Sequence, residues 1–325
     1  MSEGFVLVTG ATGFLGRHLV LALLASGVRP HCLRRAGPLP DLFAGLPVSW
    51  LAIRRPAEAS RHAERARLVF HCAARTGTAP RPNRRLRAAN VELTRAVLAG
   101  VERGGGRLVH CSTALTLGYD PAGGAVDEAH PGVPLPGGYV ATKAAAEAMV
   151  LDGAARGVDA LVVNPCYLLG PGDHRLGSTR ILWLLLRRRL PFWPVGSNNF
   201  ADVRDVAAGL MRAAERGRRG ERYLLGGENL SWRALLERAA RLAGIPPPHR
   251  SLPPAVARWL GAAGDLVGAL TGRHPLLNRV GLAIASAPCR YDCGKARRAL
   301  HWESGALDGA LRDALAWLAR RRGPA

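Results

Sequence analysis

The stretch "VLVTGATGFLGRHLV", residues 6–20, decides the fold. It places Gly10, Gly13 and Gly16 between an apolar, strand-like run and a helix-forming run. In a dinucleotide-binding unit, the first glycine allows a tight turn, the second lets the backbone approach a pyrophosphate, and the third lets the helix pack closely on the strand. The amino end of the following helix favours the phosphate charge. The stretch therefore predicts a strand, a phosphate-binding turn and a helix.

The chain up to residue 165 continues to alternate apolar runs with helical stretches, which is typical of βαβ units covered by helices on both faces. The predicted strands span 5–9, 30–34, 48–53, 68–72, 107–111 and 160–163. The clearest helices span 14–26, 84–103 and 138–156. We therefore predict an α/β protein with a Rossmann-type, doubly wound parallel sheet.

Beyond residue 165 the pattern becomes mainly helical and irregular. The predicted helices span 178–189, 203–216, 232–243, 255–271 and 307–321, and one short strand is expected at 222–225. We therefore predict a cofactor-binding domain at 1–165, to which later strands and helices return. Residues 166–325 are expected to form a smaller, mainly helical lobe that binds the substrate.

The charge of the chain is strongly basic, with a formal net charge of +21 over 325 residues. All but two of the 45 basic residues are arginines, scattered along the chain, and aromatic residues make up only 6%. Without a platform on which bases could stack, a nucleic-acid partner is not expected. Attraction to an anionic cofactor, an acidic substrate or an anionic membrane surface stays open, and with it peripheral membrane contact.

The sequence contains no run of about 18 apolar residues, so no transmembrane helix is expected. The start "MSEG" leads directly into a strand-like run and lacks the features of a signal peptide. The six cysteines form no metal-binding pattern, since Cys289 and Cys293 lack a His or a second Cys pair nearby. We expect a cytoplasmic protein with reduced thiols and no metal.

The second predicted strand ends in "HCLRRAG". NAD-selective proteins of this fold carry an acidic residue there for the ribose hydroxyls, whereas Arg34 and Arg35 occupy the place here. Guanidinium groups match a 2′-phosphate, so this pair predicts a preference for NADP(H). In an arginine-rich chain the two side chains could equally be exposed without a ligand, which keeps NAD(H) as the alternative.

A strand end carrying Ser112 and Thr113 precedes the Ala-rich stretch "GGYVATKAAAEAMV". Within that stretch Tyr139 and Lys143 lie four residues apart and therefore share one helix face. The charge of Lys143, assisted by a bound oxidised nicotinamide, would stabilise the Tyr139 phenolate and bring its pKa toward the working pH. Thr113 would hydrogen-bond the substrate oxygen while Tyr139 transfers a proton.

Tyr291 and Lys295 repeat the spacing of Tyr139 and Lys143. No glycine turn, hydroxyl-bearing strand end or Ala-rich helix precedes them, and Gly294 weakens a helix between them. We expect Asp292 to be the N-cap of the helix "GKARRAL". The second pair is therefore predicted to be structural.

Nine motifs together resemble the extended short-chain dehydrogenase/reductase family, and among its members the branch of hopanoid-associated sugar epimerases and dihydroflavonol-reductase-like proteins. They are "TGATGFLG", "VFHCAA", "NVELT", "CSTALTLG", "YVATK", "NPCYLLGPGD", "FADVRDVAAG", "GERYLLGGEN" and "YDCGKARRALHW". The resemblance spans nearly the whole chain.

This resemblance implies a catalytic triad of Thr113, Tyr139 and Lys143, with Thr113 preferred over Ser112 and with Lys143 also holding the nicotinamide ribose. It implies local hydrogen bonding by Asn90. The expected cofactor-binding residues are Gly10, Thr12, Gly13, Phe14, Leu15, Gly16, Arg34, Arg35, Cys72, Ala73, Ala74, Tyr139, Lys143 and Pro165.

The chain departs from the family pattern at two places. Members usually carry an Asp after the third strand for the adenine amino group, but here Ala52 stands near that position. Members that dehydrate sugars carry an acid beside the catalytic Thr, where this chain has Ala114 and Leu115. We therefore expect altered adenine recognition and no sugar 4,6-dehydration.

The substrate is expected to be a small molecule bound by the carboxyl-terminal lobe. Trp183, Phe192 and Trp193 favour a lipophilic substrate if they line a pocket, although they could equally form the core of the lobe. The leading hypothesis is an NADP(H)-dependent oxidoreductase acting on a secondary alcohol or ketone of a lipid-like or secondary metabolite. The alternatives are a nucleotide-sugar epimerase and a non-catalytic dinucleotide sensor. A homodimer is expected by analogy only.

Overall fold

The structure is a computed structural model that describes residues 4–39, 43, 45–190, 192–272, 275 and 277–321. Its centre is a seven-stranded sheet in which every pairing is parallel. The strands, in the order in which they lie side by side, are β10 (Arg222–Leu225), β6 (Ala160–Pro165), β5 (Arg107–Cys111), β4 (Ala66–His71), β1 (Phe5–Thr9), β2 (His31–Arg35) and β3 (Ser49–Ile53). The chain winds outward from β1 to β3 and then returns to the other side of β1. The carboxyl ends of β1 and β4 therefore border the crevice in which such sheets bind ligands.

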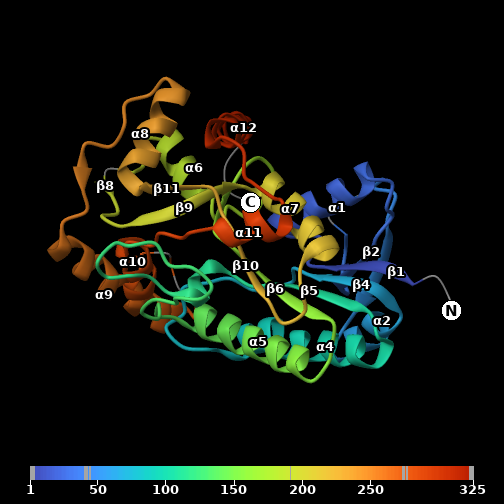
Figure 1. Cartoon of the computed structure of the whole chain (residues 1–325). Helices are drawn as coiled ribbons and strands as arrows, with labels where there is room; N and C mark the ends of the chain where they lie inside the picture. Colours follow the sequence, from blue (N-terminus) through green and yellow to red (C-terminus); the bar gives the residue numbers. More distant parts are fainter. Residues whose placement is uncertain are drawn as a thin grey trace.

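Helices cover both faces of this sheet (Figure 1). One face carries α1 (Phe14–Ala25), α7 (Val203–Arg216) and α11 (Gly294–Leu300), and the other carries α2 (Ala59–Glu64), α4 (Leu93–Gly104) and α5 (Gly138–Ala155). Alternate residues of a strand point to opposite faces. Accordingly Val6 and Val8 belong to the core under α1 and α7, whereas Leu7 belongs to the core under α4 and α5. The predicted Rossmann-type α/β fold is confirmed.

The helix predicted at 84–103 is not uniform. It consists of α3 (Arg84–Arg87), a π-helical turn η3 (Ala88–Glu92) and α4. Such a turn carries one extra residue and is frequent near functional sites. Here it brings the buried Asn90 toward α5, with a consequence for the site described below.

The carboxyl-terminal region contains strands that the sequence pattern does not predict. A three-stranded sheet combines β7 (Tyr167–Leu169), β9 (Ser197–Asp202) and β11 (Glu228–Ser231), and a small ladder pairs β8 (Phe192–Trp193) with β12 (Arg250–Ser251). The segments "SNNFAD" and "ENLS" are short and polar, so neither shows the alternation that marks a strand. The strand expected at 222–225 exists as β10 and joins the central sheet.

Helices α6 (Arg180–Leu186), α8 (Trp232–Ala243) and α12 (Leu307–Ala319) enclose a second apolar core in this region. Trp183, one of the three aromatic residues predicted either to line a pocket or to form core, is 8% exposed and belongs to that core. Phe192 and Trp193 are half-buried. Two further helices, α9 (Pro254–Thr271) and α10 (Arg279–Ser286), form a hairpin beside the amino end of α5 (Figure 1).

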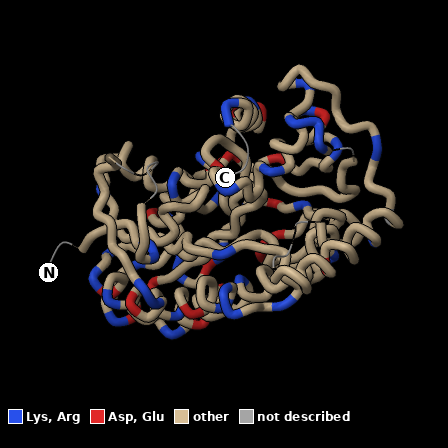
Figure 2. Tube along the Cα trace, turned by 180° about the vertical axis from the view of Figure 1, so that it is seen from behind, with Lys and Arg blue, Asp and Glu red and all other residues tan. Residues whose placement is uncertain are grey.

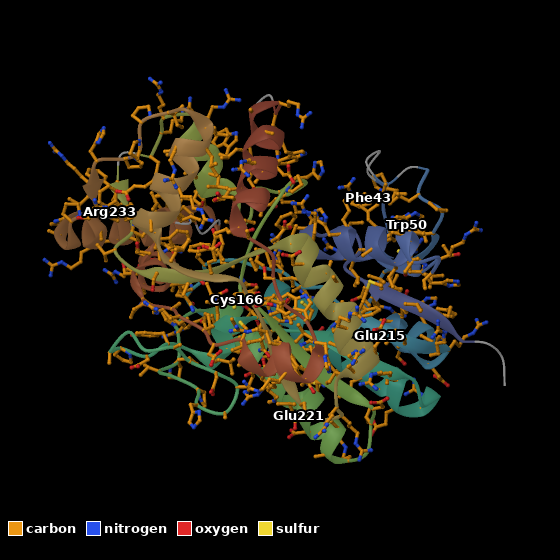
Figure 3. The ribbon with its side chains drawn as sticks, turned by 45° about the horizontal axis from the view of Figure 1, so that its top comes forward. Phe43, Trp50, Cys166, Glu215, Glu221 and Arg233 are labelled. Carbon is orange, nitrogen blue, oxygen red and sulfur yellow. The ribbon has the colours of Figure 1, made fainter. Side chains whose placement is uncertain are left out.

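The charged groups are distributed over the whole molecule, as Figure 2 shows for Lys and Arg in blue and for Asp and Glu in red. All six cysteines are free thiols. Cys166 lies between β6 and β7, where the chain leaves the central sheet (Figure 3). Within the described ranges, none of the helices has the length and the hydropathy needed to cross a membrane.

Candidate functional site

The turn after β1 is built around its first and third glycines. Gly10 has a φ of +73°, in the region that favours glycine, and a Cβ there would lie 2.6 Å from the backbone nitrogen of Ala73. A Cβ on Gly16 would lie 2.1 Å from the Gly10 carbonyl oxygen, so only glycine lets α1 approach the turn this closely. The roles predicted for Gly10 and Gly16 in the backbone are thus observed.

The amino end of α1 is suited to bind phosphate. Its N-cap residue is Gly13, which has no capping side chain, so the first amide groups of the helix remain available to an anion. Thr12 and Phe14 are half-buried, whereas Leu15 packs its side chain into the core and could meet a cofactor only through its backbone. Within the described ranges, the Nε atoms of Arg17 and Arg34 are buried without a hydrogen-bond partner. These residues fit a bound dinucleotide.

The carboxyl end of β4 borders the same turn. The backbone amides of Cys72 and Ala73 donate to the Thr9 carbonyl and hydroxyl oxygens, both at 3.2 Å, which fixes residues 72–74 beside Gly10. Ala74 is exposed. At the end of β6, Pro165 pairs with Leu225 of β10 and ends the strand next to Cys166. These residues lie at the carboxyl ends of β4 and β6, the edge of the sheet at which the cofactor is predicted to bind.

The arginine pair at the end of β2 has two different environments. Arg35 is exposed, whereas the Arg34 guanidinium group folds back and donates to the carbonyl oxygens of Arg35 and Gly37. Ala52 of β3 is the strand partner of Arg34. Because none of Arg34, Arg35 and Ala52 carries a carboxylate, these positions offer no acid that could pair with the two guanidinium groups.

Thr113 and Tyr139 come together from two elements. Thr113 follows β5 in an extended conformation, and Tyr139 lies in the first turn of α5. Burial raises the pKa of the Tyr139 phenol to about 12, with a further rise from Cys111, while a hydrogen bond with Thr113 lowers it. The pair thus provides a protonated phenol and a hydroxyl group side by side.

Lys143 is 1% exposed and lies one helical turn after Tyr139. Its Nζ donates to the Cys111 carbonyl oxygen at 2.7 Å and lies 3.5 Å from Nε2 of His110. Burial lowers the pKa of Lys143, while Cys111 and Glu147 raise it. In this geometry burial dominates the pKa of the Tyr139 phenol, and the Lys143 ammonium group is held by the strand carbonyl, so a lowered phenol pKa stays a prediction for the cofactor-bound enzyme.

Ser112, the second hydroxyl candidate, is held by a carboxylate. Its Oγ donates to Glu147 at 2.6 Å, and Thr116 and Asn164 donate to the same oxygen at 2.8 and 3.0 Å. Glu147 is 4% exposed, and Arg222 of β10 lies 3.5 Å from its other oxygen. Thr113 is therefore the hydroxyl that stays beside Tyr139.

Glu147 was not singled out from the sequence, although a signal exists. It lies four residues after Lys143 and eight after Tyr139, so the three polar residues follow one helix face in an otherwise Ala-rich segment. Asn164 links this network to the site, because its side-chain amide also donates to the Thr113 carbonyl oxygen at 3.1 Å. The network fixes the backbone that carries Thr113.

Asn90 makes the local hydrogen bonds that the sequence implied. Its side-chain oxygen accepts from the Arg75 amide at 2.7 Å, and its Nδ2 donates to the Arg75 carbonyl and the Thr142 hydroxyl, both at 3.0 Å. The π-helical turn thereby ties the loop after β4 to the helix that carries Tyr139. A series of buried hydrogen bonds continues from the Asn90 carbonyl oxygen through Thr94 to His71 and Thr9.

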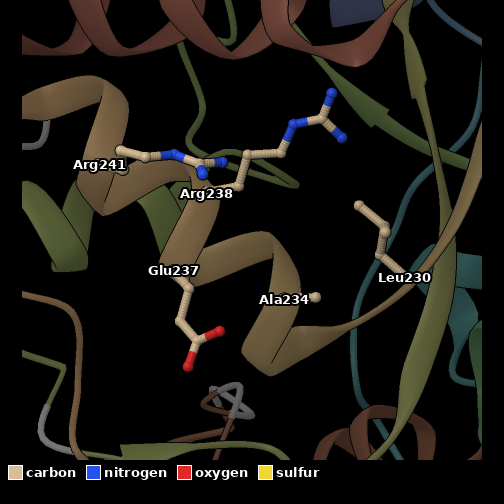
Figure 4. Close-up of a pocket in the computed structure, with 5 residues that line it drawn as sticks. All are labelled: Leu230, Ala234, Glu237, Arg238 and Arg241. Atoms are coloured by element: carbon tan, nitrogen blue, oxygen red, sulfur yellow. The ribbon is translucent and has the colours of Figure 1, made fainter.

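A surface depression lined by Leu230, Ala234, Glu237, Arg238 and Arg241 lies along α8 (Figure 4). None of the predicted cofactor-binding or catalytic residues lines it, and Arg238 is already paired with Glu228 and Asp308. The crevice at the carboxyl ends of β1, β4, β5 and β6 therefore remains the candidate site.

The second Tyr–Lys pair lies outside this site. The Tyr291 hydroxyl donates to the Gly118 carbonyl oxygen at 3.0 Å, and Lys295 forms an ion pair with Glu221, labelled in Figure 3, at 2.5 Å. The helix α11 begins at Gly294 with Cys293 as its N-cap, so the prediction that Asp292 is the N-cap is wrong by one residue. The Asp292 carboxylate nevertheless accepts the Gly294 amide at 2.8 Å.

Comparison with known sequences gives relatives of similar length. A protein of Synechocystis sp. described as a dihydroflavonol 4-reductase is 33% identical over 95% of this chain and 93% of its own length. Sterol demethylase protein B of Methylococcus capsulatus is 32% identical over 97% and 98%. A 4-hydroxy-2-methyl-3-oxo-4-farnesyl-3,4-dihydroquinoline-1-oxide ketoreductase of Stigmatella aurantiaca is 32% identical over 98% and 96%.

Comparison with solved structures also gives matches that cover nearly the whole chain. A nucleoside-diphosphate-sugar epimerase from Pseudomonas aeruginosa superimposes with a TM-score of 0.79 at 25% identity and covers 98% of both chains. The protein MoeE5 in complex with UDP-glucuronic acid and NAD gives 0.76 at 25%, covering 98% of this chain and 99% of its own. The model of the NAD-dependent epimerase/dehydratase family matches residues 6–226. The chain is thus an enzyme of the NAD-dependent epimerase/dehydratase family, within the extended short-chain dehydrogenases/reductases.

Proposed function

We propose that this enzyme is an NADP(H)-dependent oxidoreductase that interconverts a secondary alcohol and a ketone of a lipid-like or secondary metabolite. The observation that supports it most is the meeting of Thr113, Tyr139 and Lys143 at the carboxyl end of β5, on the same edge of the parallel sheet as the glycine turn of β1. Residues 1–165 would bind the cofactor and residues 166–325 would shape the substrate site.

The proposed mechanism assigns one task to each side chain. A bound nicotinamide would donate or accept the hydride. Thr113 would hold the substrate oxygen by a hydrogen bond, and Tyr139 would pass a proton to it in reduction or take one from it in oxidation. Lys143 would hold the nicotinamide ribose and bring a positive charge beside the Tyr139 phenolate.

The proposed preference for NADP(H) rests on Arg34 and Arg35 and on the absence of an acid at residues 31–37. We expect the double variant Arg34→Ala/Arg35→Ala to bind NADPH at least about tenfold more weakly, the effect of losing a charge-assisted hydrogen bond, with the dissociation constant for NADH changing less than about twofold. Arg218→Ala/Arg219→Ala removes a matched pair of surface arginines and should change neither constant. Equal losses for both cofactors would contradict the preference.

The proposed substrate class rests on two observations. The half-buried Phe192 and Trp193 lie in the region expected to shape the substrate site, and the names of two relatives include a sterol and a farnesyl group. A panel of ketones of increasing apolar surface would test it, with NADPH oxidation measured by absorbance. Turnover restricted to small polar ketones would contradict the lipophilic assignment.

A nucleotide-sugar epimerase is the second candidate, favoured by the similarity to MoeE5, which was solved with UDP-sugars and NAD. An epimerase returns its cofactor unchanged, so turnover would show no net change in NADPH absorbance and the dinucleotide would stay bound through purification. Stoichiometric NADPH consumption with a ketone would count against it. Homodimer formation also remains a proposal, which light scattering after gel filtration would test.

A further inference from the structure

Helix α9 presents an unusual pair of faces. Its buried face consists of Gly261, Gly264 and Gly268, where a Cβ on Gly264 would lie 2.0 Å from the Leu277 carbonyl oxygen. The side opposite carries an exposed apolar stripe with the spacings of three and four residues of one helix face: Val256, Trp259 and Leu260, Ala263, Leu266 and Val267, and Leu270. An amphipathic helix of a globular protein normally turns such a stripe toward the core, and α9 turns it outward.

The exposure of this stripe is large. Trp259 and Leu270 are each 78% exposed, and Leu266 is 61% exposed. Of the nine large apolar residues that are exposed in the described part of the chain, seven lie between residues 256 and 277. A contiguous apolar patch of this kind marks an interaction site.

The surroundings of the stripe are basic. Residues 75–91 contain five arginines and no acidic residue, and Arg75, Arg81, Arg84, Arg85 and Arg87 are all exposed. This segment adjoins the α9–α10 hairpin, because Thr78 donates to the Pro275 carbonyl and accepts from the Asn278 amide nitrogen. Between residues 244 and 291 the only acidic residue is Asp265, which forms an ion pair with Arg279.

The hairpin also adjoins the candidate active site. A Cβ on Gly137, two residues before Tyr139, would lie 2.7 Å from a methyl group of Val280 in α10. Ile284 of α10 packs into the same apolar cluster as Tyr139. The hairpin that carries the apolar stripe therefore also contacts the region around the first turn of α5, where Tyr139 lies.

We propose that the outer face of α9 docks on the surface of an anionic lipid bilayer, with its apolar stripe at the acyl boundary and the arginines of residues 75–87 at the headgroups. The charge of this region favours a lipid surface over a second copy of the chain, because two copies would bring their arginines together. Docking there would hold the hairpin that adjoins the candidate site against the bilayer, from which a lipophilic substrate could be drawn; that last consequence rests on the proposed function, whereas the docking does not.

The test is sedimentation of the full chain with vesicles of phosphatidylcholine, with and without phosphatidylglycerol, in the absence of substrate. We expect binding to the mixed vesicles, weakened by salt, and little binding to phosphatidylcholine alone. The double variant Trp259→Glu/Leu270→Glu should bind at least about tenfold more weakly, because two charges would enter the acyl boundary. The matched variant Val133→Glu/Val195→Glu, which places the same charges at exposed valines outside α9, should bind like the unaltered protein.

Two further measurements keep the outcomes separate. Brominated lipids should quench the fluorescence of the unaltered protein more than that of Trp259→Phe. Equal binding by the α9 variant and its control, or no binding to mixed vesicles, would overturn the docking. So would a dimer that the α9 variant converts to a monomer, since the face would then belong to a second copy. Because NADPH consumption by a soluble ketone is measured without vesicles, failure of the docking and failure of the proposed reductase are independent results.

Discussion

Tyr139 with Lys143 and Tyr291 with Lys295 share a spacing, yet their surroundings give them opposite properties. The first lysine is 1% exposed and hydrogen-bonded to a strand carbonyl, whereas the side chain of the second is 31% exposed and paired with Glu221. Tyr139 is half-buried beside the Thr113 hydroxyl, whereas Tyr291 is 1% exposed and its hydroxyl donates a hydrogen bond to the Gly118 carbonyl oxygen. A Tyr and a Lys four residues apart are therefore suited to catalysis only where they lie at the same sheet edge as a hydroxyl-bearing strand end and a glycine turn.

The two tyrosines are nevertheless connected through packing. Both contribute to one apolar cluster, and Tyr291 supports the backbone at Gly118, five residues after Thr113. The pair Tyr139 and Lys143 would therefore supply the reacting groups, whereas the pair that contains Tyr291 stabilises the loop that positions them. Substitutions in matched pairs can separate these tasks.

The largest difference is expected between Tyr139→Phe and Tyr291→Phe. Removing the Tyr139 hydroxyl should lower kcat by about 10³-fold while NADPH still binds, because general acid catalysis would be lost. Tyr291→Phe should leave kcat within about threefold, since its hydroxyl makes a structural hydrogen bond. Steady-state kinetics and fluorescence titration with NADPH measure both. Full activity in Tyr139→Phe would refute the mechanism and favour the non-catalytic sensor.

The lysines sharpen the comparison. Lys143→Met should lower kcat/KM by about 10²-fold or more, because the buried ammonium group would no longer reach the nicotinamide ribose or the phenolate. Lys295→Met should leave kcat/KM unchanged and lower the free energy of unfolding by less than about 1 kcal/mol, as for other partly exposed ion pairs. Similar kinetic losses in the two variants would remove the distinction between the pairs.

Glu147 should show that the first pair depends on a buried support. Glu147→Ala should lower the free energy of unfolding by about 3 kcal/mol, because Ser112, Thr116, Asn164 and Arg222 would each lose one acceptor. The exposed Glu215, which pairs with Arg212 at the surface, offers the control Glu215→Ala, expected to cost less than about 0.5 kcal/mol. Denaturant unfolding curves of the two variants would decide.

Alkaline pH should destabilise the fold through the first tyrosine. The phenol of an unfolded chain ionises near pH 10, whereas burial raises the pKa of Tyr139 to about 12. The contribution of the Tyr139 phenol to the free energy of unfolding is therefore fully present below pH 10. It falls by about 1–3 kcal/mol as the pH rises toward 12. Tyr139→Phe should reduce that fall but not remove it, because burial also raises the pKa of Tyr167 and Tyr291. Unfolding midpoints at pH 9 to 12 would detect the reduction, with an unchanged slope as the contrary result.

The smallest effect concerns the structural tyrosine. Tyr291→Phe should lower the free energy of unfolding by about 1 kcal/mol, because the buried Gly118 carbonyl would lose its donor. Tyr119→Phe, at a half-buried position beside the same loop, is a suitable control for a tyrosine hydroxyl. A loss above about 3 kcal/mol would mean that the hydroxyl holds more than one turn in place.

The sequence predicts the first half of the fold well because its signals are local. Glycine spacing, apolar runs and an Ala-rich helix can each be recognised within about fifteen residues, and β1, α1 and α5 follow from them. The polar strands β9 and β11 are not predictable in this way, since Asn199 and Asn229 become strand residues only through each other. The π-helical turn at Asn90 likewise depends on partners at Arg75 and Thr142. Glu147 shows the same limit, since its partners lie after the end of β5, on β6 and on β10.

The near absence of lysine has a practical consequence for work on this enzyme. An amine-reactive reagent meets only Lys143, Lys295 and the chain's amino terminus, and Lys143 is shielded within α5. Lys295, the second residue of α11, is therefore a nearly unique attachment point for a dye or a spin label on the central sheet's helical layer. Lys295→Arg would leave a chain whose remaining side-chain amine reports directly on access to the crevice, through the rate at which it becomes acylated.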